Sequence, residues 1–161
     1  MDIKIYNTSF EVAVRILVLI TRFDRCLDIQ EIITYDYLML HLADINKKCT
    51  SLHPDNPFHS IELYSRRKLV QDAVVLLASK GLLLSDCNIN GISYRPTGIS
   101  NKFLEYFESN YFNKLMENAN VLNEKYSRMS ITDINNLINQ KYESTKNKFD
   151  YEALFKGEDN E

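Results

Sequence analysis

Residues 51–94, with the sequence SLHPDNPFHSIELYSRRKLVQDAVVLLASKGLLLSDCNINGISY, decide the fold that we expect for this chain. The stretch opens with a polar, proline-containing segment that predicts a long loop ending near His59. A helix is expected next, from Ser60, which can cap its first turn, to Gly81, which can adopt the left-handed conformation that ends a helix. Two short apolar runs flank Asn90-Gly91, a strong signal for a β-hairpin. A helix followed by a hairpin is typical of the second half of a winged helix-turn-helix domain.

Two further helices are predicted before this stretch. Residues 10–23 repeat apolar side chains at helical spacing, which places one face of the helix in the core and directs Arg15 and Arg22 to the other side. Residues 29–45 form the second helix, after a polar turn at 24–28. Asp36 and His41 interrupt the apolar stripe of this second helix. We interpret them as half-buried polar residues with local partners rather than as a catalytic pair.

The chain after the hairpin is also predicted to be helical. An aromatic-rich helix is expected over 99–111, a continuation over 112–127, and a last helix from Ser130. The narrow apolar stripe of that last helix suits a segment that becomes ordered on a partner. We therefore predict a mainly α fold, a winged helix-turn-helix with a two-stranded wing and additional C-terminal helices. The expected divisions are a winged-helix core at 1–112, a helical extension at 113–149 and an acidic, disordered tail at 150–161.

Composition and charge narrow the class of function. Hydrophobic residues make up 45% of the 161 residues and charged residues 25%, as in an ordinary globular protein. The formal net charge is −3, and five acidic residues against one lysine at 150–161 give a local −4, which leaves +1 for the rest. A nearly neutral body is a poor nucleic-acid binder, because non-specific affinity requires clustered Lys and Arg. No apolar run reaches the roughly 20 residues of a membrane span, so we expect a cytoplasmic protein without a membrane partner.

Catalytic and metal-binding motifs are not recognisable in the sequence. It has no phosphate-binding glycine loop, no Gly-x-Ser-x-Gly element and no nuclease-type carboxylate cluster with a lysine. Cys49, His53 and His59 are the best candidates for metal ligands, but no second pair of ligands completes a tetrahedral site. We therefore expect no enzymatic activity, no catalytic residues, no metal site and no cofactor.

DNA binding is the main alternative that the residues themselves leave open. Arg66, Arg67 and Lys68 fall in the N-terminal half of the helix that would be the recognition helix, and Tyr94 and Arg95 fall on the wing. Phosphate and base contacts are expected at such positions in a DNA-binding protein. The same basic run is also typical of a solvated face or of a surface that docks a protein. A winged-helix DNA-binding transcriptional regulator is therefore the competing function.

Four short motifs resemble a known family. They are a Ser-Leu-His-Pro loop at 51–54, a Ser-x-Glu-Leu-x-x-Arg-Arg helix start at 60–67, a Lys-Gly-Leu helix end at 80–82 and a Tyr-Arg pair at 94–95. Together they resemble the middle component of ABC-three-component systems and are similar to the small third subunit of Lamassu-type anti-phage defence complexes. The resemblance covers roughly residues 10–125. In the family pattern an arginine precedes the serine of the helix start and a glycine follows it, where this chain has His59 and Ile61.

The resemblance implies a non-catalytic adaptor subunit in the bacterial cytoplasm. Such a subunit joins an SMC-like, DNA-sensing ATPase to a nuclease-type effector and helps to hold the effector inactive until foreign DNA is sensed. The ATP and nuclease sites would belong to the partner chains, and DNA would be contacted through the complex rather than by this chain alone. The residues expected to order the loop or to bind a partner are His53, Glu62, Arg66, Arg67 and Lys68. On the wing, the residues expected to contact DNA or a partner are Tyr94 and Arg95.

Overall fold

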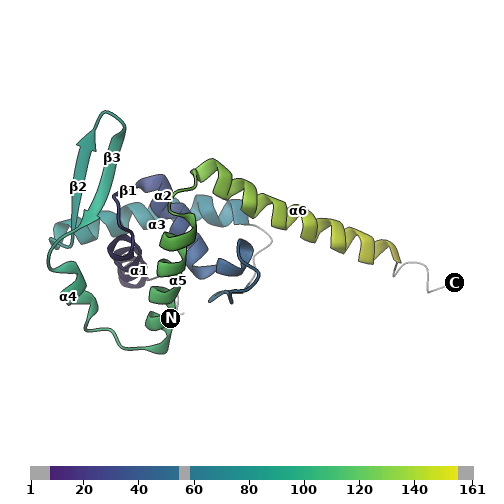
Figure 1. Ribbon diagram of the computed structural model, residues 1–161, viewed down its shortest axis with the longest axis horizontal. Coiled ribbons are helices and arrows are strands. Elements are labelled where there is room, and N and C mark those ends of the chain that lie inside the picture. Colours follow the sequence, from purple (N-terminus) through teal and green to yellow (C-terminus); the bar gives the residue numbers. More distant parts are fainter. Residues whose placement is uncertain (1–7, 55–58, 156–161) are drawn as a thin grey trace, which may run out of the picture.

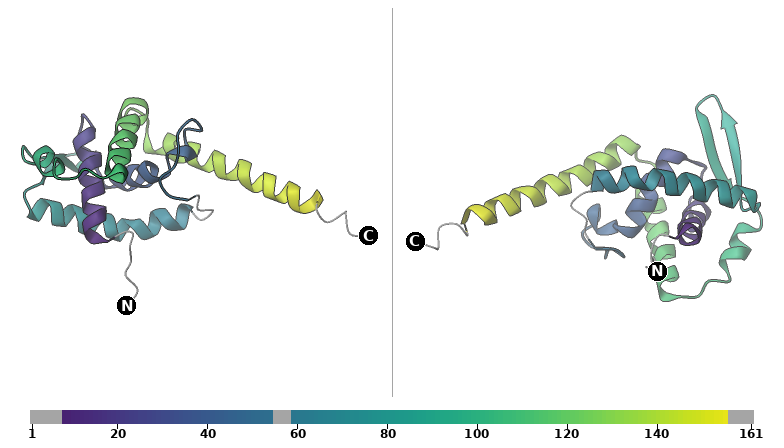
Figure 2. Two further views of the ribbon diagram at one scale, coloured as in Figure 1. Left: turned by 90° about the horizontal axis from the view of Figure 1, so that it is seen from below. Right: turned by 180° about the vertical axis from the view of Figure 1, so that it is seen from behind.

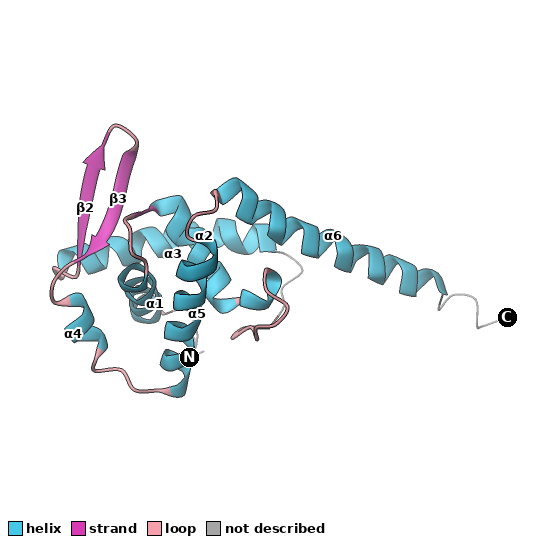
Figure 3. Cartoon of the chain, in the orientation of Figure 1, coloured by secondary structure: helices cyan, strands magenta, loops and turns pink. Residues whose placement is uncertain are grey.

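The computed structural model describes residues 8–54 and 59–155. The chain is mainly helical, with a small antiparallel sheet (Figure 1 and Figure 3), which confirms the prediction of a mainly α protein. In chain order the elements are α1 (Ser9–Arg22), β1 (Leu27–Asp28), α2 (Ile29–Leu40), η1 (Leu42–Asp44), α3 (His59–Ser79), β2 (Leu83–Asn88), β3 (Gly91–Pro96), α4 (Ser100–Leu104), α5 (Asn110–Tyr126) and α6 (Ile131–Phe155).

Helix α1, rather than the stretch 51–94, lies at the centre of the fold. Every residue from Val12 to Ile20 is buried, and the helix contacts α2, α3, α4, α5 and β3. Figure 1 shows α1 end-on, surrounded by α3, α4 and α5. The prediction that Arg15 points away from the core is therefore wrong. Because other helices cover α1 on all sides, only 1% of Arg15 is exposed, and Arg22 is half-buried.

The sheet has three strands in the order β1-β3-β2. Strands β2 and β3 form the hairpin that Asn90-Gly91 predicted, with Asn88 opposite Gly91 at the turn. Gly91 has a φ of 120°, in the region that favours glycine. Strand β1 pairs with β3, and Leu27 lies opposite Tyr94. The sequence predicted a polar turn here, because a strand of two residues has no periodicity that could reveal it.

The C-terminal end of α3 anchors the segments that follow it. Gly81, with a φ of 70°, ends the helix, and the N–H of Leu82 donates a hydrogen bond to the carbonyl of Leu77 at 2.9 Å, as in a Schellman motif. The hydroxyl of Thr97 donates to the carbonyl of Gly81 at 2.7 Å, and that of Ser100 donates to the carbonyl of Leu82 at 2.6 Å. The base of the hairpin and the start of α4 are therefore both fixed to the end of α3.

Helix α5 belongs to the helical core. It packs against α1 and α2, and Asn118 on this helix is buried with its side-chain amide donating to the carbonyl of Met39 at 2.8 Å. The predicted division between residues 112 and 113 falls inside this helix. Its buried apolar residues are Phe112, Leu115, Ala119 and Leu122.

Helix α6 begins against α2 and η1 and then extends away from the body (Figure 1 and Figure 2). Ile134 and Ile138 are buried near its start. The helix includes residues 150–155, which the sequence assigned to a disordered tail; this stretch contains Glu, Ala and Leu, which are good helix formers. Residues 156–161 of that predicted tail lie outside the described part of the chain. Among the described helices, none is long and apolar enough to cross a membrane.

Replacing Asn118 tests whether its hydrogen bond holds α5 on the end of α2. We expect Asn118→Ala to lower the free energy of unfolding by about 1–3 kcal/mol, because it leaves a buried carbonyl without its donor. Urea unfolding followed by circular dichroism measures the change. Asn120→Ala, at an exposed position of the same helix, is the control and should cost less than about 0.5 kcal/mol. Equal unfolding midpoints for the two variants would contradict this role.

Candidate functional site

A fully buried carboxylate, Asp36 of α2, lies where three helices meet. Nε and Nη2 of Arg15, on α1, donate hydrogen bonds to its two oxygens at 2.8 and 3.0 Å. Nη1 of Arg66, on α3, donates to the second oxygen at 2.9 Å. The prediction of a local partner for Asp36 is wrong, since its partners are 21 and 30 residues away in the chain. One side chain therefore links α1, α2 and α3.

The charges of this cluster stabilise one another. Desolvation by burial acts to raise the pKa of Asp36, but Arg15, and after it Arg66, lower that pKa below its ordinary value of 3.8. Desolvation likewise acts to lower the pKa of Arg15, whereas the Asp36 carboxylate raises it, so that the pKa lies above its ordinary value. At neutral pH the carboxylate and the guanidinium are therefore both ionised, which a buried position permits because they are paired.

Glu62 supplies a second carboxylate to this cluster, and Glu11 of α1 lies 3.6 Å from Arg15. Glu62 lies one turn before Arg66 on α3 and accepts hydrogen bonds from Nε of Arg66 at 3.0 Å and from Nη2. Nε2 of the buried His41 lies 3.4 Å from the same carboxylate, while Nδ1 has no hydrogen-bond partner among the described residues. We call Arg15, Asp36, His41, Glu62 and Arg66 the Asp36 network.

The loop at 51–54 is fixed to the end of α2 beside the Asp36 network. The backbone N–H groups of Leu52 and His53 both donate to the carbonyl of Leu40, at 2.8 and 3.1 Å. The hydroxyl of Ser51 accepts a hydrogen bond from a backbone N–H of η1 at 3.2 Å. These contacts give hydrogen-bond partners to backbone groups at and just after the end of α2. The loop therefore has a defined conformation in this part of the chain.

The His53 ring connects the loop to α5. Its Nε2 lies 3.3 Å from the hydroxyl of Tyr111, and its ring meets the His41 ring edge-on with centroids 6.1 Å apart. Desolvation, followed by the positive charge of Arg15, lowers the pKa of His53 below 6.5. Burial raises the pKa of Tyr111 to about 12. At neutral pH the pair therefore consists of an uncharged imidazole and a protonated phenol.

A second buried carboxylate, Asp44 of η1, holds the middle of α6. It accepts hydrogen bonds from the hydroxyl of Tyr37 at 2.7 Å, from Nζ of Lys141 at 2.5 Å and from the hydroxyl of Tyr142 at 3.2 Å. Burial, together with hydrogen bonds to Tyr142 and Asp44, raises the pKa of Tyr37. The Tyr37 ring also stacks on His41, with centroids 4.6 Å apart. Polar contacts thus continue from the Asp36 network to α6.

The network lies within a stretch that matches a known protein family. The family model described as ABC-three component (ABC-3C) system Middle Component 2 matches residues 5–148. The chain belongs to this family. Neither the curated proteins nor the solved structures contained a match. As a middle component, the chain has other subunits of the system as its partners.

The predicted site residues of this middle component fall into two groups. His53, Glu62 and Arg66 lie in or beside the Asp36 network, where Glu62 and Arg66 bond to each other. Arg67 and Lys68 are exposed. The prediction of one exposed basic patch formed by Arg66, Arg67 and Lys68 is therefore wrong, because each step along a helix rotates the side chain by about 100°. Arg66 faces the core while its two neighbours face solvent.

The exposed cations lie in different surroundings. Lys68 forms an ion pair with Asp72 at 2.6 Å. Arg67 lines a shallow hollow of about 210 Å³ between α2, α3 and the start of α6. On the hairpin, Arg95 forms an ion pair with Asp86 at 2.9 Å, and Tyr94 is half-buried. Arg67 lies in the N-terminal half of α3, and the hairpin follows the C-terminal end of that helix (Figure 1).

Sequence reasoning missed several members of the polar clusters. Arg15 and Asp44 were not recognised as buried, and Asp36 and His41 were assigned local partners. The signal that could have identified them is a charged side chain within a strongly apolar helix, as at Arg15 in 12–20 and Asp36 in 32–40. Such a residue needs a partner of opposite charge from another element.

The structure adds little to the expectation of no metal site. Within the described ranges, no group of three or more His, Cys, Asp or Glu side chains is placed to hold a metal ion. The side chain of His59, one of the three candidate ligands, is not among the side chains that the structure describes. The absence of a metal, of a cofactor and of catalytic residues stays a prediction.

Removing the charge of Asp36 should be far more costly than removing an exposed carboxylate. We expect Asp36→Asn to lower the free energy of unfolding by about 3–5 kcal/mol, because it removes the buried negative charge that two buried guanidinium groups share. The matched control is Asp72→Asn, which breaks an exposed ion pair and should cost less than about 1 kcal/mol. Guanidinium-induced unfolding of both variants and the wild type gives the comparison. Similar losses would show that the network adds no specific stability.

The pH dependence of the unfolding free energy should also show the contribution of the ionised Asp36 side chain. Because the pKa of Asp36 is lowered on folding, its contribution is complete above its ordinary value of 3.8 and is lost as the pH falls below that value. We therefore expect the difference in unfolding free energy between wild type and Asp36→Asn to be constant from pH 7 to 5. Below about pH 4 it should shrink by up to about 1.4 kcal/mol per pH unit. A difference that already shrinks between pH 7 and 5 would contradict the lowered pKa.

Proposed function

We propose that this chain is a non-catalytic adaptor subunit of a bacterial, Lamassu-type anti-phage defence complex. It bridges an SMC-like, DNA-sensing ATPase and a nuclease-type effector in the cytoplasm, and it helps to hold the effector inactive until foreign DNA is sensed. Membership of the middle-component family supports the adaptor role. The motifs at 51–54, 60–67, 80–82 and 94–95 support the comparison with Lamassu-type subunits.

The order of the elements supports a winged helix-turn-helix fold within this proposal. Helices α1, α2 and α3 precede the β2–β3 hairpin, and β1 joins the hairpin as a third strand. In this fold α3 takes the place of the recognition helix, and the hairpin is the wing. The surface that would meet DNA in a regulator is therefore formed by the exposed side of α3 and by the hairpin.

The character of that surface is the observation that carries the proposal. Val75 of α3 is 68% exposed and Ile92 of the hairpin is 51% exposed, and both line a hollow of about 350 Å³ between the two elements. Ile89, at the tip of the hairpin, is fully exposed. Exposed apolar groups that lie close together are typical of protein-binding surfaces, whereas affinity for DNA depends on cations. The surface suits a partner protein better than a phosphate backbone.

The basic residues also argue against the alternative function, which is DNA binding. Of the cations proposed to contact DNA, Arg66 is buried, and Lys68 and Arg95 are each paired with a carboxylate. Because Arg67 is exposed, a DNA-binding transcriptional regulator is the second candidate function. Such a regulator would bind a specific duplex as the isolated chain, with an affinity that falls steeply as salt increases.

Co-expression of the tagged chain with the products of the neighbouring genes tests the adaptor function. We expect a coiled-coil ATPase and a second, effector subunit to be recovered together with the chain, because it binds both. The isolated chain should not shift duplex DNA at physiological salt. Recovery of the chain alone as a homodimer that binds a specific duplex would overturn the adaptor and favour the regulator.

The same purification tests the exposed surface at Arg67. We expect Arg67→Glu to lower recovery of a partner by about tenfold, which corresponds to about 1.4 kcal/mol of binding free energy. Arg128→Glu, an equal charge reversal at another exposed arginine, is the control and should leave recovery unchanged. Unchanged assembly and unchanged protection against phage with Arg67→Glu would exclude this residue from partner binding.

A further inference from the structure

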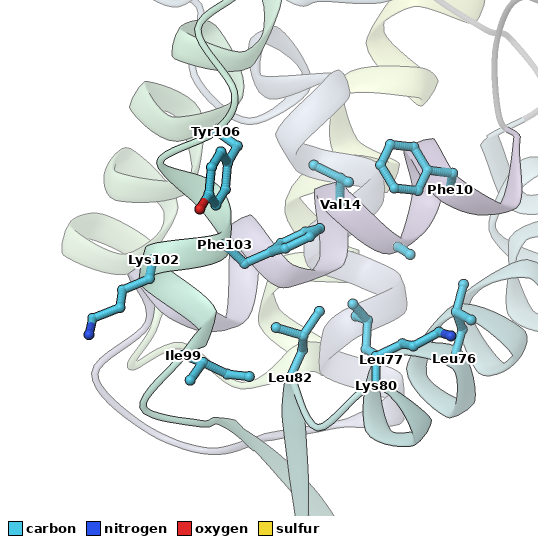
Figure 4. Close-up of a pocket in the computed structure, with 11 residues that line it drawn as sticks. Phe10, Val14, Leu76, Leu77, Lys80, Leu82, Ile99, Lys102, Phe103 and Tyr106 are labelled. Carbon is cyan, nitrogen blue, oxygen red and sulfur yellow. The ribbon is translucent and has the colours of Figure 1, made fainter.

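An apolar groove lies at the end of the molecule opposite the free end of α6 (Figure 1 and Figure 4). It has a volume of about 540 Å³. One wall is the first turns of α1, the second is the C-terminal end of α3, and the third runs from the end of the hairpin through α4. The side chains that line it include Phe10 of α1, Leu76 of α3, and Phe103 and Tyr106 of the third wall.

The groove has a buried apolar floor and an exposed apolar rim. Ala13, Val14 and Leu77 are buried along the floor. At the rim, Phe10 is exposed and Tyr106 is 85% exposed. Single exposed apolar residues are ordinary, but exposed aromatic groups around a continuous apolar hollow are typical of a binding surface. Residues 51–54 and the Asp36 network take no part in lining it.

Two lysines give the rim a positive charge. Lys80 comes from the end of α3 and Lys102 from α4, and the ammonium groups lie at two separate positions of the rim (Figure 4). Both are exposed, and neither forms an ion pair within the described part of the chain. No acidic side chain is among the residues that line the groove. The groove therefore complements a ligand that is apolar on one side and acidic at its edges.

The walls of the groove favour a helix as that ligand. An extended peptide binds well where a sheet edge offers free backbone groups, but these walls are mainly helical and hydrogen-bonded internally. A helix satisfies its own backbone and can place apolar residues at three- and four-residue steps along the groove. Residues 150–161 of the same molecule are acidic, but 150–155 form the last part of α6, which leads away from the opposite end of the body (Figure 2).

We infer that this groove binds an amphipathic helix of a partner subunit, one with an apolar stripe and with Asp or Glu on both sides of it. The apolar stripe covers the floor and the exposed aromatic groups, and the acidic residues pair with Lys80 and Lys102. The inference rests on the proposed adaptor function and adds to it the surface used for one of the two partners and the chemistry of the segment that is bound.

Charge reversal in the co-expressed complex tests the acidic character of the partner. We expect Lys80→Glu/Lys102→Glu to lower recovery of one partner subunit at least about tenfold, because like charges then face each other across the rim. The other partner should still be recovered, which separates a failure at the groove from a failure of the adaptor function. The control, Lys114→Glu/Lys125→Glu, makes the same change of charge on exposed lysines of α5 outside the groove. Unchanged recovery with the groove variant would overturn the inference.

Photocrosslinking identifies the bound segment directly. A benzophenone amino acid replaces Tyr106 in the full chain within the assembled complex, and Asn120, an exposed position of α5 outside the groove, serves as the control position. We expect position 106, and not position 120, to crosslink a helix of a partner subunit with apolar residues at helical spacing and flanking acids. Replacing those acids by lysine should restore binding to Lys80→Glu/Lys102→Glu.

Two crosslinking results would contradict the inference. A crosslink from position 106 to residues 150–161 of a second copy would assign the groove to self-association. An intact complex without any crosslink from position 106 to a partner would show that the groove remains open after assembly. Failure to recover any complex would instead refute the adaptor function, and the groove inference with it.

Discussion

The buried carboxylate of Asp36 is the constraint on which the rest of the structure depends. Arg15 and Arg66 reach it from α1 and α3, so a single group in α2 sets the mutual position of three helices. Removing ions from water costs several kcal/mol per group, and this cost is offset only when every partner is in place. Incomplete arrangements of the helices are therefore strongly disfavoured. We infer that the main contribution of the cluster is the selection of one helix arrangement, because an apolar cluster of similar volume could give equal net stability.

Polar contacts also connect the Asp36 network to the loop at 51–54 and to α6. Glu62 joins Arg66 to His41, and the His41 ring stacks on Tyr37. The Tyr37 hydroxyl bonds to Asp44, which in turn bonds to the middle of α6. The loop at 51–54 is held beside the same cluster by backbone hydrogen bonds to the end of α2. The position of the loop and the direction in which α6 leaves the body are thus set by directional contacts.

The residues that carry the family resemblance include both buried and exposed side chains. His53, Glu62 and Arg66 belong to motifs of the family pattern, and their side chains lie in or beside the Asp36 network. The exposed apolar surface of the hairpin, the hollow beside Arg67 and the lysine-rimmed groove lie mostly outside those motifs. Part of the motif pattern in this chain therefore supports the fold, through the contacts of Glu62 and Arg66. These surfaces lie at separate places on the molecule, which suits a subunit with more than one partner.

The sequence by itself determined the local features of this protein. The helical class follows from apolar spacing, the end of α3 from Gly81, and the hairpin from Asn90-Gly91, because each depends on residues a few positions apart. The tertiary structure alone decided that α1 is central, that Arg15 and Arg66 are buried, and that a two-residue strand joins the sheet. Each of these depends on partners brought together by folding, such as the two arginines 21 and 30 residues from Asp36. A charged residue in a helical pattern faces solvent unless another element supplies its counterion, and local spacing contains no information about that element.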